Sequence, residues 1–122
     1  MPTKIELRPT LEISILKESA VVENFQNQTL RPILKLQNEL YLSLFKSYLI
    51  RQKVDFKTFT KDKKRVFIEQ SLQKDLVLKN TFIGITIGMF TSDELDQYLL
   101  ESKEFNRRIV TMLMERIKSQ VD

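Results

Sequence analysis

Histidine and cysteine are both absent from this 122-residue chain. Without cysteine there is no disulfide framework, no thiolate metal site and no thiol nucleophile. Without histidine, a zinc site would lack its usual nitrogen ligands, and Ser-His or Cys-His nucleophile pairs are excluded. Only carboxylates and amides are left to build a metal site. We therefore expect no bound metal, and no motif points to a cofactor.

Glycine and proline are also scarce, at two and three residues, where average usage would give roughly 8 and 6. β-Hairpins and α/β loops need glycine for turns of positive φ, so the scarcity favours helices. Charged residues make up 30% and hydrophobic residues 42% of the chain, which is typical of a globular protein. We predict an all-α fold: a small antiparallel bundle of about four or five helices over 19–122, after an extended N-terminal arm over 1–18.

The arm is predicted from apolar side chains that alternate with polar ones around Pro9, a pattern typical of an extended segment. Its apolar members are Ile5, Leu7, Leu11, Ile13 and Ile15. We expect the arm to lie on a surface, its own or a partner's. Lys4, Glu6 and Arg8 interrupt any apolar run near the start, so no secretory signal is expected and a cytoplasmic location is the default. Ser19 is a candidate N-cap for the helical lead-in that follows.

The strongest helical pattern runs from Leu30 to about Lys53, with apolar residues on one face and further apolar residues on the other sides. A helix this apolar is expected to be covered on more than one side. Gln37 and Asn38 lie within its apolar surface, and we interpret them as buried amides that hydrogen-bond across helices. Pro32 either sits in the first turn of a helix capped by Thr29 or kinks a continuous helix.

Later helices carry signals for their ends. Thr60 is a candidate N-cap for a helix that ends near residue 73. Asp75 either caps a new helix or lies inside one that continues to residue 90. Thr91, followed three residues later by Glu94, forms a capping box for a last helix whose apolar stripe continues to residue 117.

The stretch NTFIGITIGMFTSDE at 80–94 contains both glycines, Gly84 and Gly88, in an isoleucine-rich run. Its charge-free part, 80–92, is 13 residues long, which is too short for the roughly 20 residues that cross a bilayer. Its glycines lack the spacing of phosphate-binding loops. The alternation over 82–89 is that of a strand, and two glycines disfavour a helix by roughly 1 kcal/mol each.

A helix is nevertheless our prediction for this stretch, with a strand as the alternative. The preceding residues are compatible with a helix, and the capping box that follows leaves only a short turn, as between antiparallel helices. In a helix, Thr81, Gly84, Ile85 and Gly88 form a shallow stripe that another helix or a ligand can approach closely.

The net charge of +4 lies in the segment KVDFKTFTKDKKR at 53–65, which holds six basic and two acidic residues. Part of it falls near the predicted start of a helix, where a bound anion is favoured. Phe56 and Phe59 offer stacking faces for a nucleic acid. The candidate anion-binding residues are Lys57, Lys61, Lys63, Lys64 and Arg65. A solvated surface run is the commoner meaning of such a pattern, because nucleic-acid proteins normally show a broader basic face.

Three blocks resemble one family: FQNQTLRPILKLQNEL at 25–40, LQKD at 72–75 and IGITIGMFTSDE at 83–94. They are similar to a group of small bacterial helical proteins, of comparable length, that often carry the name glyoxalase. The resemblance covers the chain from residue 25 onward and implies no catalytic residue. Metal-dependent and hydrolase glyoxalases use histidine and the cofactor-free type uses a cysteine nucleophile, so a glyoxalase-like enzyme is disfavoured.

Three classes of function compete. We favour a non-enzymatic helical protein that acts by association, as a homodimer or with another protein, because its apolar surface exceeds what one small bundle covers. Binding of nucleic acid or another anion at 53–65 is the alternative, and no membrane partner is expected. Least favoured is an enzyme that uses Glu101 and Glu104, three residues apart on one helix face, or Tyr41 and Tyr48. Glu104 is also placed to pair with Arg108.

Overall fold

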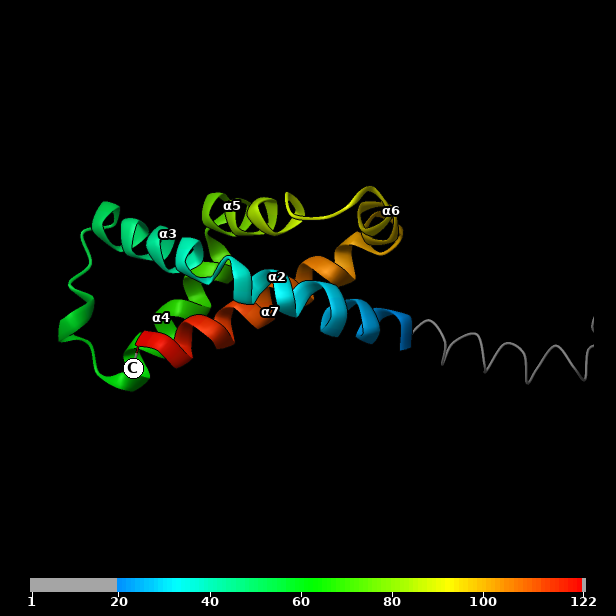
Figure 1. Cartoon of the computed structure of the whole chain (residues 1–122). Coiled ribbons are helices and arrows are strands. Elements are labelled where there is room, and N and C mark those ends of the chain that lie inside the picture. Colours follow the sequence, from blue (N-terminus) through cyan, green and yellow to red (C-terminus); the bar gives the residue numbers. More distant parts are fainter. Residues whose placement is uncertain (1–19, 122) are drawn as a thin grey trace, which may run out of the picture.

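The computed structural model describes residues 20–121, which form six α-helices and no strand (Figure 1). The predicted all-α fold is confirmed. A helical turn over 20–25 leads into the π-helix η1, and a 3-10 turn η2 precedes α4. The elements are η1 (Gln26–Leu30), α2 (Arg31–Leu36), α3 (Asn38–Arg51), η2 (Phe56–Thr58), α4 (Lys61–Lys74), α5 (Leu76–Ile87), α6 (Ser92–Leu100) and α7 (Ser102–Val121). The predicted arm over 1–18 and the Ser19 cap lie outside the described residues.

Residues 20–36 form one continuous helical run that contains Pro32. The backbone on both sides of η1 keeps right-handed helical φ and ψ, so the alternative in which Thr29 caps a new helix is wrong. Proline cannot donate a backbone hydrogen bond and crowds the carbonyl four residues before it. Just before Pro32 the helix widens, because the Arg31 N–H bonds the Gln26 carbonyl five residues back. The π-helix thus gives the proline room inside a helix.

The helix predicted over 30–53 is divided at Gln37, which corrects the expectation of one continuous helix. Gln37 has φ −94° and ψ 10°. Its carbonyl accepts from the N–H groups of Leu40 and Tyr41 at 2.9 and 3.2 Å, so this one oxygen serves two donors at the start of α3. No glycine or proline stands at the break.

Two residues after the end of α3, Lys53 has a left-handed backbone with φ 55°. The N–H of Lys53 bonds the Ile50 carbonyl, and the N–H of Val54 bonds the Leu49 carbonyl, each at 3.0 Å. This pair of bonds is the Schellman motif, which usually places glycine where Lys53 stands. The chain therefore closes α3 without using either of its glycines.

Thr60 caps α4 as predicted, and Asp75 caps α5, which was one of the two alternatives for this residue. Thr60 Oγ1 accepts from the Lys63 N–H at 3.2 Å, and the Asp75 carboxylate accepts from the Leu78 N–H at 3.0 Å. Asp75 itself is extended, so α5 is a new helix and the alternative of one helix continuing to residue 90 is wrong. The isoleucine-rich stretch lies in α5, so its predicted helix is confirmed and the strand alternative is wrong.

The capping box at Thr91 and Glu94 is present, with backbone-to-side-chain bonds of 2.8 and 3.2 Å in the two directions. The last helix was expected to be continuous, but Glu101, at φ −140° and ψ 44°, divides it into α6 and α7. Leu99, which belongs to the predicted apolar stripe, is consequently 61% exposed. In α6 the stripe reaches the core at Tyr98, and it continues into the core in α7.

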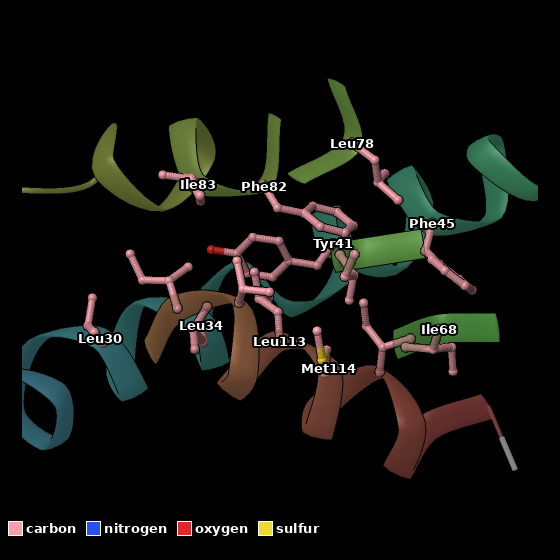
Figure 2. Packing of buried hydrophobic residues seen from close by; sticks show 14 of the residues in the cluster. Leu30, Leu34, Tyr41, Phe45, Ile68, Leu78, Phe82, Ile83, Leu113 and Met114 are labelled. Carbon is pink, nitrogen blue, oxygen red and sulfur yellow. The ribbon is translucent and has the colours of Figure 1, made fainter. Parts of the chain in front are cut away.

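α7 is the central helix of the bundle and packs against α4, α5, α6 and η1. Its nearly fully buried side chains are Phe105, Ile109, Leu113 and Ile117. Figure 2 shows the rings of Tyr41 on α3 and Phe82 on α5 next to each other. Their centres are 5.8 Å apart and their planes lie at 77°, an edge-to-face contact. α5 is thus held through its inner side.

Candidate functional site

The side of α5 that points away from the core carries no charge and is open to solvent. We call it the α5 outer face; its six exposed residues are Leu76, Val77, Asn80, Thr81, Gly84 and Gly88. Leu76 and Val77 are 65% and 71% exposed. Thr81 donates its hydroxyl to the Val77 carbonyl at 2.7 Å, so its one donor is already used within the helix. The α5 outer face therefore offers apolar and small groups.

The two glycines leave part of this face without side chains. A Cβ built on Gly84 would meet nothing within 4 Å outside its own helix. Gly88 follows the last turn of α5 with φ −59°, and a Cβ there would lie 3.3 Å from the Gly84 carbonyl oxygen. Neither glycine serves a positive φ or a close contact with another described helix. Ile85, the fourth residue of the predicted stripe, is half-buried against the core.

The apolar surface of 30–53 is covered on one side only within the described part of the chain. Tyr41, Phe45 and Tyr48 face the core. Ile50 is 77% exposed, and Leu40 is also exposed. Within residues 20–121, the buried and half-buried side chains of α3 therefore form one stripe, and the expected cover on a second side is not found there.

The basic segment 53–65 folds onto its own aromatic rings. Phe56 and Phe59 have their ring centres 5.7 Å apart, and both contact a third ring on α4. The Lys63 ammonium lies 4.2 Å from the centre of the Phe59 ring, and that of Lys64 lies 5.4 Å from the Phe56 ring. These cation–π contacts take up ring surface. Phe56 and Phe59 are thus not the open stacking platforms that the sequence suggested.

The five candidate anion-binding residues lie on two adjoining elements. Lys57 is on η2, and the other four are in the first turns of α4. Lys64 is half-buried and its ammonium reaches the Val121 carbonyl at 3.4 Å, whereas Lys57, Lys61, Lys63 and Arg65 are exposed. The structure therefore keeps these charges on one corner of the bundle.

Asn38 links the start of α3 to α7. It donates to Gln120 Oε1 at 2.7 Å and accepts from Gln120 Nε2 at 2.8 Å, with Arg116 at 3.5 Å from the same acceptor oxygen. The predicted cross-helix bonding thus exists for Asn38, although the residue is half-buried and not buried. Gln37, also half-buried, acts through its carbonyl at the helix break.

The two candidate catalytic carboxylates do not share a helix. Glu101 lies at the break between α6 and α7 and is exposed. Glu104 pairs with Arg107 at 2.6 Å and with Arg108 at 2.9 Å, which includes the predicted Arg108 pair. Hydrogen bonds from these two guanidinium groups lower the pKa of Glu104 from 4.5 to about 2. Glu104 therefore stays ionised at neutral pH and does not act as a proton donor.

The candidate tyrosines are core residues. Tyr41 is 1% exposed, and its hydroxyl lies 2.7 Å from Thr86 Oγ1. Burial raises the pKa of Tyr41, against smaller lowering effects of Thr86 and Arg116. Tyr48 is also buried. Among residues 20–121, the hydroxyl partner of Tyr41 is Thr86 and not a base of the kind that activates a nucleophile.

Within residues 20–121, no group of three acidic side chains is placed to hold a metal ion. No helix in the same range is long and apolar enough to span a membrane.

An open groove between η1, α2 and α7 was missed by the sequence reasoning. Arg31, Leu34, Met112 and Arg116 are among the residues that line it. Its construction depends on the π-helix, which departs from the α-helical repeat on which face assignments rest. Pro32, inside an otherwise helical pattern, is the one local sign in the sequence that the repeat changes here.

No family model matches this chain, and neither the curated proteins nor the solved structures contain a match. The resemblance to proteins named glyoxalase stays a prediction from its three sequence blocks.

Proposed function

We propose that this protein is a non-enzymatic helical protein that acts by self-association through the α5 outer face. The observation that carries the proposal is an exposed, uncharged helix face whose backbone is open at Gly84. Single exposed apolar residues are ordinary, but a contiguous apolar face on a folded domain marks an interaction site.

A second copy of the same chain is the partner that this face fits. In a two-fold symmetric contact, each residue near the axis meets its own copy, so a charge there would be repelled. The α5 outer face has no charged residue. With Gly84 near the axis, two α5 helices can approach closely, and Leu76 and Val77 of each copy can pack against the other.

The expected dimer is weak. Four apolar side chains, Leu76 and Val77 from each copy, contribute together up to roughly 6–12 kcal/mol if fully buried. Loss of translational and rotational freedom opposes this by about 4–15 kcal/mol. Association should therefore depend strongly on concentration in the micromolar to millimolar range.

Sedimentation velocity over that range tests the proposal. The wild-type chain should shift from monomer to dimer as its concentration rises. Val77→Glu should keep it monomeric, because two carboxylates would meet near the axis. The matched control is Leu36→Glu on α2, which changes an apolar residue that is 70% exposed, against 71% for Val77, and should leave the dimer intact. A wild-type monomer at every concentration, or equal effects of the two variants, would refute the proposal.

Nucleic-acid or anion binding at 53–65 is the second candidate, supported by the exposed cations on η2 and the first turns of α4. Affinity for a nucleic acid should then fall steeply with salt. Lys63→Glu combined with Lys64→Glu should abolish the binding. Lys35→Glu combined with Lys46→Glu, an equal change of net charge at exposed positions on α2 and α3, should not. Absence of binding by the wild-type chain at low salt would end this candidate.

A further inference from the structure

The groove between η1, α2 and α7 combines an apolar floor with a basic rim. Leu34 is nearly fully buried and Met112 half-buried at the floor, and Arg31 and Arg116 stand on opposite helical elements. The groove has a volume of about 660 Å³. This volume lies in the range of small-molecule sites.

The π-helix builds one wall of this groove. In an α-helix, residues five apart are turned from each other by roughly 140° around the axis. The Arg31 N–H bonds the Gln26 carbonyl in η1, and both residues line the groove. π-Bulges inside α-helices often occur at functional sites. The widened turn therefore aligns Arg31 with Gln26, and with Leu34 one turn later, on the same side of the helix.

The two arginines of the groove differ from their neighbours on α7. Arg107 and Arg108 are ion-paired with Glu104. Arg31 instead donates its Nε–H to the Asn27 amide oxygen at 2.8 Å, and the Arg116 guanidinium lies 3.5 Å from the Asn38 amide oxygen. Within residues 20–121 neither has a carboxylate partner.

Glu115 is the acidic residue of the groove lining, and it is occupied elsewhere. Its carboxylate lies 3.6 Å from the Lys118 ammonium, and its side chain is 72% exposed. The remaining donors of Arg31 and Arg116 are thus available to an anion from outside the chain.

We propose that this groove binds a small organic acid, with its carboxylate held by the arginines of the rim, Arg31 and Arg116, and its hydrocarbon part on Leu34 and Met112. Guanidinium groups suit this role because their planar forks match a carboxylate with paired hydrogen bonds. The apolar floor selects an acid with a hydrocarbon body over a bare anion. The site is on elements other than α5, so it stands or falls independently of self-association.

The probe is hexanoate, titrated against the ¹⁵N-labelled full chain at constant ionic strength while the arginine Nε–Hε signals are followed by NMR. The Arg31 and Arg116 signals should shift to saturation. Acetate should bind at least about fivefold more weakly, because it buries fewer methylene groups. Hexanol, which lacks the charge, should bind at least about tenfold more weakly.

Variants test the two guanidinium groups. The double variant Arg31→Gln with Arg116→Gln should bind hexanoate at least about tenfold more weakly than wild type. Arg31→Lys should have an affinity between that of the double variant and that of wild type. Arg51→Gln removes the same charge from the end of α3 and should bind as wild type. Circular dichroism checks that each variant is folded. The proposal is overturned if acetate binds as well as hexanoate, if the double variant binds as wild type, or if all arginine signals shift together without saturation.

Discussion

α5 has one face packed against the core and one face in solvent, and both are made largely of apolar residues and threonine. On the inner face, Phe82 and Thr86 are fully buried. On the outer face, Val77 and Thr81 are exposed. Both threonines donate to the carbonyl four residues earlier, at 2.7 Å for Thr81 and 3.0 Å for Thr86.

The difference between the faces is in what their side chains meet. Since Thr86 gives its one proton to the Phe82 carbonyl, the Tyr41 hydroxyl must donate to Thr86 Oγ1. Thr81 has no such partner from another described helix. Apolar composition alone therefore does not identify the stabilising side of a helix. The stabilising side is the one whose large side chains contact other helices. The outer face contributes little to folding and is free for association.

The largest difference in stability between changes on the two faces is expected for truncation of Phe82. Phe82→Ala removes a fully buried ring that contacts Tyr41 and should reduce the free energy of unfolding by about 3–5 kcal/mol. Val77→Ala on the outer face should change it by less than about 0.5 kcal/mol. Urea denaturation of dilute protein measures both, and similar losses would remove the contrast.

The two threonines give a finer test with one kind of substitution. Thr86→Val leaves the buried Tyr41 hydroxyl without its acceptor and should reduce stability by about 1–3 kcal/mol. Thr81→Val should be within about 0.5 kcal/mol of wild type, because its hydroxyl bonds only its own helix. Adding Tyr41→Phe to Thr86→Val should restore part of the loss. If the second change adds a further loss, the hydrogen bond is not the cause.

Replacing either glycine with alanine should raise the free energy of unfolding, whereas the preceding substitutions lower it or leave it nearly unchanged. Gly84→Ala should stabilise the dilute chain by about 0.5–1 kcal/mol, because glycine disfavours a helix interior and the added Cβ has open space. Gly88→Ala should gain less, since its Cβ lies 3.3 Å from the Gly84 carbonyl oxygen.

The same position should behave differently in the dimer. Gly84→Leu should weaken association in sedimentation experiments while the monomer keeps its fold, because the side chain separates two closely packed helices. A destabilised monomer in thermal melts of Gly84→Ala would show that the outer face is not open. An unweakened Gly84→Leu dimer would place the contact elsewhere.

Acid should lower the stability of the fold through Glu104 on α7 and should not change the contrast between the two faces of α5. Its effect on the free energy of unfolding should be the smallest of this series. The pKa of Glu104 is lowered from 4.5 to about 2 in the folded chain. Its pairing therefore stabilises the fold above pH 4.5, and this contribution is lost as the pH falls from 4.5 through about 2. The side chain is partly exposed, so solvent screening keeps the effect small.

Urea midpoints measured across that interval test the assignment. Glu104→Gln should flatten the decline of stability with acid. Glu101→Gln, which removes a carboxylate at the nearby helix break, should retain the wild-type decline. Identical profiles for wild type and Glu104→Gln would show that the pair with Arg107 and Arg108 does not contribute.

Helix starts were the part of the fold most accessible from sequence. Thr60, Asp75 and the box of Thr91 with Glu94 act on N–H groups at most three residues away, so the sequence alone contains the interaction. The breaks at Gln37 and Glu101 were not predicted. No glycine or proline marks them, and the local pattern is compatible with continuous helices.

The candidate site was predictable only in its composition. The sequence placed Thr81, Gly84 and Gly88 on one helix face, but periodicity does not tell which face the rest of the chain covers. The sequence showed that the basic segment falls at the start of a helix. The contacts of Lys63 and Lys64 with Phe59 and Phe56 could not be predicted, because they depend on how η2 packs against α4. The groove between η1, α2 and α7 could not be predicted either, because it depends on a turn that does not follow the α-helical repeat.

The π-helix η1 is equivalent to a one-residue insertion in a helix. Each residue of an α-helix advances the chain by roughly 100° around the axis. The extra residue therefore rotates the side chains that precede η1 by about this angle relative to those of α2. On that earlier side, Phe25 has its ring centre 4.5 Å from that of Phe105 and 5.5 Å from that of Phe90. Deleting the exposed Gln28 would restore the ordinary repeat and rotate Phe25 away from both rings. Chain length in this segment, and not only residue identity, thus determines whether the first described turn is anchored to α7.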